Sequence, residues 1–217
     1  MNPRQRVLNH AGSLLGGMVH NLNTPLMWIM GRSQLIETRN DMLSEMDGMS
    51  PEEISKIAKK NREDLASILE GAEAINSILK AVSYKIQMAQ GEIESVDLRE
   101  YLRMETDFLM ADMRFKHDTK RELQIDTQGS CYVKIDYNVL SSAFVEAIDA
   151  IIDSTDKGRV IKIALDGSAV KIACPDARPE TKIKDRLDSI FKELSSVADV
   201  YVDDSHGVSV SIQVRQA

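Results

Sequence analysis

Residues 13–36 read SLLGGMVHNLNTPLMWIMGRSQLI, and an apolar residue returns at every seventh position through them. The same interval continues on both sides, so the apolar stripe runs over residues 4–40. An apolar repeat sustained over four heptads is typical of a helix in a coiled coil or bundle. We therefore expect one long helix here. Its seam consists of Leu8, Leu15, Leu22, Ile29 and Ile36, and it is widened by Met18, Val19 and Leu26.

A second long helix is expected after a break. The segment 40–51, NDMLSEMDGMSP, interrupts the repeat. Ser50-Pro51-Glu52-Glu53 then supplies an N-cap serine, a proline in the first turn and a capping-box glutamate. This predicts a helix from Pro51 to about Met88 with two apolar rows at seven-residue spacing. One row is Ile54, Asn61, Ile68, Ile75 and Val82, and the other is Ala58, Leu65, Ala72, Leu79 and Ile86.

An antiparallel hairpin of these two helices would leave apolar surface uncovered. A second copy of the hairpin would bury that surface, so we expect a homodimer joined in a four-helix bundle. The polar Asn61 at a seam position would fix the register and the number of helices. The alternative is a monomeric hairpin that packs against the C-terminal part of its own chain.

The hydrophobic period changes from residue 92 onward, which places a boundary near Gln90-Gly91. The pattern predicts an α+β fold, in which residues 1–90 form the helical hairpin and residues 91–217 form an α/β sandwich with helices on one face of a mixed sheet. Helices are expected over 95–113, 137–153 and 181–197. Strands are expected at 122–126 and 131–136 around a Thr-Gln-Gly-Ser turn, at 160–165 and 168–174 around Asp166-Gly167, and at 199–204 and 208–214 around Ser205-His206-Gly207.

Composition excludes several classes of protein. The 27 Lys and Arg residues are outnumbered by 34 Asp and Glu residues, and this acidic balance disfavours binding to nucleic acid. No apolar run is long enough to span a membrane. The two cysteines, Cys131 and Cys174, lie far apart, and the four histidines are not clustered, so we expect no disulfide framework, no structural metal site and a reducing, cytoplasmic location.

His20 lies opposite the apolar seam on a helical wheel, so it is expected to face solvent or a partner. The same face carries Ser13, Gly16, Gly17, Thr24 and Gly31. Glycine in a helix interior costs about 1 kcal/mol relative to alanine, so three glycines on one exposed face suggest close approach by another macromolecule. Pro25 would bend the helix beside His20. His20 is either an ordinary surface histidine or a nucleophile that carries a phosphoryl group.

The stretch 13–36 resembles the H-box of two-component sensor histidine kinases, in which a histidine is followed by an acidic residue and, five places on, by a proline. His20 and Pro25 match that pattern. Residues 135–151, IDYNVLSSAFVEAIDAI, resemble the N-box helix of the ATP-binding domain that follows the hairpin in this family. The resemblance covers nearly the whole chain. It implies a dimerisation and histidine phosphoacceptor hairpin at 1–90 and an ATPase-like domain at 91–217.

Other positions depart from the family pattern. The acidic residue after the histidine is replaced by Asn21, and the two N-box asparagines, the second of them a Mg²⁺ ligand, by Ser142 and Glu146. Asp176 matches the adenine-binding aspartate, but both glycines that follow it in the family are missing. A helix, rather than a mobile lid, is expected to follow. The resemblance thus implies a degenerate ATPase-like domain, with Glu146 and Asp176 as remnants of the nucleotide site and no ATP or Mg²⁺ cofactor.

These observations favour a phosphotransfer protein of two-component signalling. His20 would exchange a phosphoryl group with an aspartate of a response-regulator receiver domain, or assist receiver dephosphorylation, without efficient use of ATP. Catalytic roles are expected for His20, Asn21 and Thr24. Thr24 would either hold an attacking water or bond to its own helix backbone. The alternatives are an ATP-dependent sensor histidine kinase core and a non-catalytic pseudokinase scaffold.

Overall fold

A computed structural model describes residues 2–45, 49–91, 95–125, 131–153, 155, 158–175, 177, 192, 194–195, 197–203 and 207–215. The N-terminal half contains α1 (Pro3–Ser13), α2 (Leu15–Glu45) and α3 (Pro51–Gln90). The chain divides into two compact units: Gly16–Lys80 forms one, and Met1–Leu15 with Ala81–Ala217 forms the other. The domain boundary expected near Gln90-Gly91 stays a prediction.

The prediction of a single helix over residues 4–40 is wrong, because the helix is broken at Leu14. The Ser13 hydroxyl donates a hydrogen bond to the carbonyl of His10 at 2.8 Å. The Leu14 N–H bonds to the carbonyl of Ala11 at 3.3 Å, instead of to the carbonyl of His10 as in a regular α-helix. A serine that bonds to a nearby carbonyl competes with the regular helix ladder. The result is a tightened turn that ends α1 and lets α2 begin as a separate helix.

The second helix begins as the sequence predicts. The Ser50 hydroxyl accepts a hydrogen bond from the Glu53 N–H at 3.2 Å, and a Glu53 carboxylate oxygen accepts the Ser50 N–H at 2.9 Å. These reciprocal bonds form a capping box, which satisfies two donors that the first turn would otherwise leave unpaired. They also hold the pKa of the Glu53 carboxyl below its usual value.

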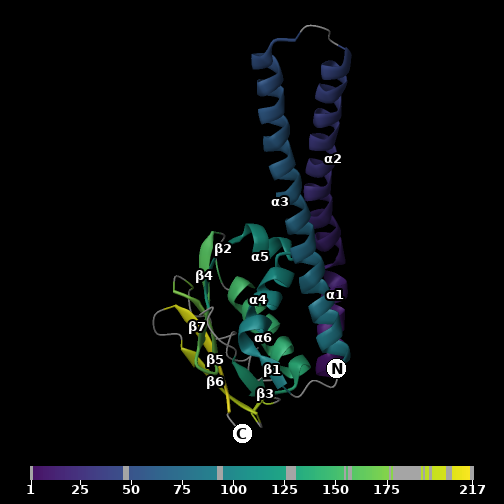
Figure 1. Cartoon of the computed structure of the whole chain (residues 1–217). Helices are drawn as coiled ribbons and strands as arrows, with labels where there is room; N and C mark the ends of the chain where they lie inside the picture. The colour runs from purple at the N-terminus through teal and green to yellow at the C-terminus, as the bar shows by residue number, and fades with distance from the viewer. Residues whose placement is uncertain are drawn as a thin grey trace. The chain divides into compact units, whose positions relative to one another are not determined.

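Within the unit Gly16–Lys80, α2 and α3 run side by side as a hairpin (Figure 1). They approach closely at Gly71 of α3. A Cβ atom there would lie 3.0 Å from Cγ1 of Ile29 and 3.3 Å from the carbonyl oxygen of Pro25. Pro25 is buried inside α2. The two helices therefore pack closely beside the proline that follows His20 by five residues.

Two glycine substitutions are expected to change stability in opposite directions. In the part of the chain that the structure describes, a Cβ at Gly31 would meet no heavy atom within 4 Å, so Gly31→Ala should raise the free energy of unfolding by about 0.5–1 kcal/mol. Gly71→Ala should lower it by about 1 kcal/mol, because overpacking against Ile29 and Pro25 exceeds the gain in helix propensity. Urea unfolding of the two matched variants measures both effects. A gain in stability for Gly71→Ala would contradict the tight contact.

The C-terminal half contains two sheets and three helices in the part of it that the structure describes. The helices are α4 (Leu98–Leu109), α5 (Met113–His117) and α6 (Tyr137–Asp153). The strands are β1 (Ser95–Asp97), β2 (Thr119–Gln124), β3 (Tyr132–Lys134), β4 (Arg159–Asp166), β5 (Ala169–Cys174), β6 (Ala198–Asp203) and β7 (Val208–Val214). The larger sheet has the order β2-β4-β5-β7-β6, and β1 pairs with β3 in the smaller one. The α+β fold class is confirmed.

Two of the three expected hairpins are found. β4 and β5 pair antiparallel with Asp166 opposite Ala169, and Gly167 in the turn has φ +59°. β6 and β7 also pair antiparallel. The third pairing is wrong: β2 lies parallel to β4, and β3 pairs with β1. Parallel strands need a crossover, usually a helix, and α6 lies between β2 and β4 in the chain to provide it.

Two of the three helices expected in this half differ from the prediction or fall largely outside the described residues. The helix predicted over 95–113 starts later and ends earlier than expected. Residues 95–97 form β1, because the Asp97 side chain caps α4 by accepting the Arg99 N–H at 3.1 Å. α4 ends at Leu109, and Asp112 caps a separate helix, α5, by accepting the Arg114 N–H at 2.8 Å. Most of the helix expected at 181–197 lies outside the described residues.

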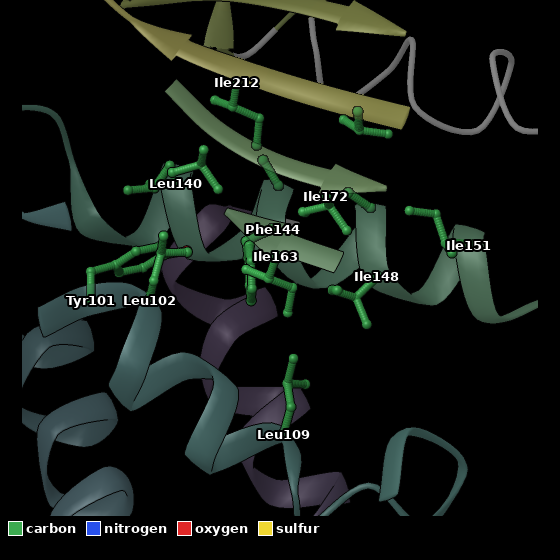
Figure 2. Packing of buried hydrophobic residues seen from close by; sticks show 14 of the residues in the cluster. Tyr101, Leu102, Leu109, Leu140, Phe144, Ile148, Ile151, Ile163, Ile172 and Ile212 are labelled. Carbon is green, nitrogen blue, oxygen red and sulfur yellow. The ribbon is translucent and has the colours of Figure 1, made fainter. Parts of the chain in front are cut away.

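The core lies between the larger sheet and the helices α4 and α6 (Figure 2). Side chains along each strand point alternately to the two faces of the sheet. Ile163 of β4, Ile172 of β5 and Ile212 of β7 all point to the face that packs against these helices. Phe144 and Tyr101 meet edge to face, with their ring centroids 5.9 Å apart. Because this apolar layer covers one face of α4 and one face of α6, only their other faces remain available for contacts outside the core.

Candidate functional site

His20 is exposed on α2, as the helical wheel predicts. One turn further on, the Thr24 hydroxyl donates a hydrogen bond to the His20 carbonyl oxygen at 3.3 Å. This is the bond to the helix backbone that the sequence left as one of two alternatives for Thr24. Its expected role toward an attacking water stays a prediction.

The remaining residues around His20 have different environments. Asn21 is buried, with 9% of its surface exposed, although it directly follows the exposed histidine. Gly16 and Gly31 are open: among the described residues no heavy atom would lie within 4 Å of a Cβ at either position. Packing within the chain therefore does not require glycine there, and at Gly16, one turn before His20, no side chain stands beside the imidazole.

A polar network holds the hairpin together farther along. Asp64 of α3 is buried and accepts hydrogen bonds from Arg32 and Arg39 of α2, each at 2.6 Å. The hydrogen bond from Arg39 lowers the pKa of the Asp64 carboxyl. Asn61 accepts a bond from Arg39 at 3.1 Å and donates one to Asn40 at 3.1 Å. Asn61 therefore fixes the register of α2 against α3 within one chain, and its expected role in a dimer stays a prediction.

The residues expected at a degenerate nucleotide site lie in the other compact unit. Ser142 is buried on α6, and Glu146 one turn later is half-buried. Both line a cavity of about 250 Å³ between α6 and α1. Asp176 falls outside the described residues, so its expected role is not located. Gly207, with φ +98°, packs against the carbonyl oxygens of Cys174 and Pro175, and a side chain there would collide with them.

His10 of α1 also lines the cavity of Ser142 and Glu146. Its ring is 6.1 Å from that of Phe108, and its Nδ1 is buried without a hydrogen-bond partner among the described residues. Burial, assisted by the positive charge of Lys85, lowers the pKa of His10 to about 4. At neutral pH the imidazole is uncharged.

His10 should make stability depend on pH between about 6.5 and 4. In this range the unfolded chain binds a proton at residue 10 and the folded chain does not, so the free energy of unfolding falls as the pH falls. The full effect is up to about 3 kcal/mol below pH 4 and is absent above 6.5. Urea unfolding of the native chain and of His10→Gln at several pH values isolates this part, because the variant should lose less stability on acidification. Parallel pH curves would contradict the lowered pKa.

A fully buried charged network joins α3, α4 and α6, and sequence analysis missed it. Nζ of Lys85 lies 2.5 Å from Oε2 of Glu105 and 3.0 Å from Oγ of Ser141. The other carboxylate oxygen of Glu105 accepts the Tyr137 hydroxyl at 2.5 Å and Ser141 at 3.2 Å. Burial, followed by the charge of Glu105, raises the pKa of Tyr137 well above its usual value. Glu105 lies in the apolar stripe of α4, between Leu102 and Leu109. A carboxylate in an apolar stripe is the sequence feature from which this buried network could have been predicted.

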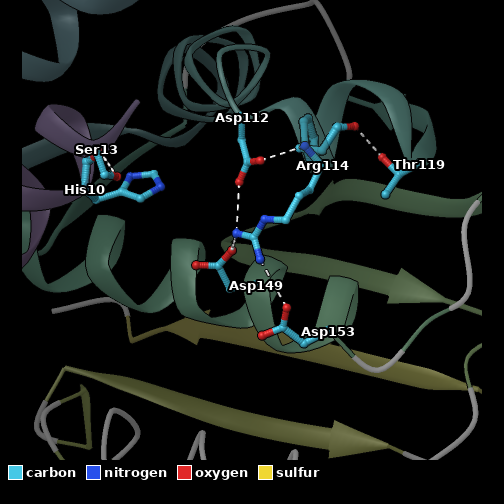
Figure 3. A network of polar contacts seen from close by, with 8 residues as sticks. His10, Ser13, Asp112, Arg114, Thr119, Asp149 and Asp153 are labelled. Carbon is cyan, nitrogen blue, oxygen red and sulfur yellow. Dashed lines mark hydrogen bonds and ion pairs between the residues drawn. The ribbon is translucent and has the colours of Figure 1, made fainter. Parts of the chain in front are cut away.

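A second network ties α5 to α6. The Arg114 guanidinium binds Asp112 at 3.1 Å, Asp149 at 2.8 Å and Asp153 at 3.1 Å, and Figure 3 shows it reaching toward α6. Hydrogen bonding to Asp112 and the surrounding carboxylates raise the pKa of Arg114 despite partial burial. The side chain is about half exposed, so this network positions α5 and adds little stability.

Within the described residues, no cluster of His, Cys, Asp and Glu is suited to holding a metal ion. None of the helices among the described residues has the length and hydropathy needed to cross a membrane.

Comparison with known proteins gives structural similarities only. No protein-family model matches the chain, and no curated protein matches it. The cytoplasmic segment of histidine kinase QseC is similar at 11% identity and a TM-score of 0.46, over 59% of this chain and 81% of that one. A bacterial phosphotransferase is similar at 10% identity and a TM-score of 0.42, over 94% and 95%. Histidine kinase AdeS of Acinetobacter baumannii is similar at 14% identity and a TM-score of 0.41, over 91% and 98%.

Histidine kinases are also the proteins that the sequence resembles through its H-box and N-box.

Proposed function

We propose that this protein acts in two-component signal transduction by exchanging a phosphoryl group between His20 and an aspartate of a response-regulator receiver domain. The exposed imidazole of His20, on a long helix beside open glycine positions, is the observation that carries the proposal. In the transfer, a ring nitrogen attacks the phosphorus of the aspartyl phosphate. The N–P bond forms as the P–O bond breaks, and the aspartate leaves as a free carboxylate.

The absence of a side chain at Gly16 supports this assignment. A receiver must bring a phosphorylated carboxylate within bonding distance of the imidazole, and Gly16 leaves the surface open one turn before His20. Gly31 does the same about three turns after His20. The neighbouring Thr24 is exposed as well, so it is accessible to a bound receiver.

We propose further that the protein works without efficient use of ATP. Ser142 and Glu146 stand where the family resemblance places two asparagines, and Ser142 is bonded to Arg6 of α1 at 2.8 Å. Asn21 cannot accept a proton from His20 during attack on ATP. It is also buried rather than beside the exposed imidazole. A phosphorylated receiver is therefore the proposed phosphoryl donor.

The transfer of label from a receiver tests the function. The protein is mixed with a receiver domain that carries ³²P on its aspartate, and the products are separated by mass. Acid-labile label on residue 20 is the expected result. Label that appears on His20 from Mg-ATP alone would instead favour the sensor kinase. Receiver binding without any transfer or dephosphorylation would favour the pseudokinase scaffold.

The proposed homodimer is supported by the apolar surface of the hairpin. Large apolar side chains remain exposed on both helices of the unit Gly16–Lys80. They are Val19, Leu26, Met27, Trp28, Met30, Leu35 and Met42 of α2, and Ile54, Leu65, Leu69 and Leu79 of α3. Leu65 and Leu79 belong to the second seven-residue row of α3. Exposed apolar side chains in this number indicate an interaction site, and a second hairpin is its natural complement.

Sedimentation equilibrium at micromolar concentration should find twice the chain mass of 24.3 kDa. Leu79→Asp should shift the protein to the monomer, because an unpaired charge buried in a dimer interface costs several kcal/mol. Leu79 is 52% exposed in the single chain, so the variant should still fold. Ser77→Asp, an exposed site off this row, is the matched control and should remain dimeric. A native protein that sediments only as a monomer would reject the dimer.

A further inference from the structure

α1 is docked along α6, within the compact unit formed by Met1–Leu15 and Ala81–Ala217. Nε of Arg6 donates a hydrogen bond to Oγ of Ser142 at 2.8 Å. Val7 is 2% exposed and belongs to the core cluster of this unit. Figure 3 shows His10 and Ser13 of α1 on the same side of α6 as Asp149. α1 therefore forms part of the fold of this unit, although it precedes the hairpin in the sequence.

The face of α6 under α1 carries Ser142 and Glu146. Ser142 is only 4% exposed, and the cavity that Ser142 and Glu146 line together with α1 has a volume of about 250 Å³. A larger pocket of about 660 Å³ lies at the start of both helices, beside Arg4 and Asn138, and neither Ser142 nor Glu146 lines it. Pockets for ligands of drug-like size usually have about 300–1,000 Å³. The cavity is therefore below the size needed for a nucleoside triphosphate, and α1 supplies one of its walls.

We propose that α1 is a fixed cover that closes this face of α6 to nucleoside triphosphates, with Arg6 as its polar anchor and Val7 as its apolar one. The choice of a nucleotide as the excluded ligand rests on the proposed function, because only the family resemblance assigns Ser142 and Glu146 to a nucleotide site. The cover itself rests on the contacts of Arg6 and Val7. The break at Leu14 makes α1 a separate helix, so it is free to follow α6.

Cysteine labelling of the whole 217-residue chain tests the cover. In a Cys131→Ser background, Ser142→Cys reports the covered face, and Asp153→Cys reports the exposed end of the same helix. A maleimide should label residue 142 at least about tenfold more slowly than residue 153, because reaction requires local opening. Equal rates would overturn the proposal.

Loosening α1 supplies the second arm. Val7→Thr keeps the side-chain size but buries a hydroxyl, so labelling of residue 142 should become about tenfold faster while that of residue 153 stays constant. Cys174, which is fully buried, must stay unlabelled as evidence that the unit is folded. If it does not, Val7→Ala, which removes apolar contacts without burying a hydroxyl, replaces Val7→Thr. An unchanged rate at residue 142 in a folded variant would show that α1 is not the cover.

Calorimetry of the native chain with Mg-ATP supplies the third arm, and no saturable heat is expected. Saturable binding that also slows labelling of residue 142 would overturn the proposal. Failure of the cover can be distinguished from failure of the proposed function. Label transfer from a receiver to His20 tests the function, and cysteine labelling tests the cover.

Discussion

His20→Ala is expected to abolish phosphoryl exchange with a receiver domain while the protein stays folded. The imidazole is the proposed nucleophile, and loss of a nucleophile removes the reaction path rather than weakening binding, so the rate should fall by at least about 100-fold. His20 is exposed, so the free energy of unfolding should change by no more than about 0.5 kcal/mol. Label transfer and urea unfolding, measured on the same preparation, check both parts.

Two variants on the same helix serve as controls for His20→Ala. Asn23→Ala, at an exposed neighbouring position, should leave both stability and transfer close to native. Leu22→Ala should do the reverse of His20→Ala: stability falls by about 2 kcal/mol, at the low end for leucine because this side chain is half-buried, and transfer persists in the folded fraction. An unfolded His20→Ala chain would show that the residue is structural. A stable variant with undiminished transfer would refute the phosphotransfer proposal.

The fold was predictable where the signals are local. The capping box at Ser50 set the start of α3, and the Asp166-Gly167 turn set the β4–β5 hairpin. The bounds of α6 also agree with the expected 137–153. The prediction of one continuous helix over residues 4–40 failed because two local hydrogen-bond patterns compete at Leu14. The heptad repeat continues through Leu14, and nothing in that repeat reveals that the Ser13 hydroxyl takes the carbonyl of His10.

The pairing of β2 with β4 could not be read from local pattern. A strand that is followed by a turn and another strand predicts a hairpin, yet β3 finds its partner in β1 more than 30 residues earlier. Such pairing depends on which edges the helices leave open, and that is a property of the assembled fold.

The candidate site was predictable only in part. A helical wheel is sufficient to place His20 outside the seam, because exposure on a helix depends on spacing along it. The environment of Ser142 and Glu146 depends instead on α1, which is more than 120 residues away in sequence. The expected dimer remains a prediction for the same reason: apolar rows indicate that a surface is buried, but not by which partner.

Lys85→Met is expected to lower the free energy of unfolding by about 3–5 kcal/mol, because it leaves the Glu105 carboxylate buried without its cation. Lys85 and Glu105 are 1% and 0% exposed, so water cannot replace the lost ion pair. Lys80→Met, at an exposed position on the same helix, is the control and should change stability by no more than about 0.5 kcal/mol. Urea unfolding of the chain measures both variants.

The double variant Lys85→Met/Glu105→Leu should recover much of that loss, since replacing both charges removes the unpaired ion. Recovery is expected to be incomplete, because the hydroxyls of Tyr137 and Ser141 also bond to Glu105 and would lose their acceptor in the apolar pair. A coupling energy near zero, with the double variant as unstable as the sum of the single ones, would mean that Lys85 stabilises the fold through its packing over Phe108, 4.8 Å from the ring centroid, rather than through its charge.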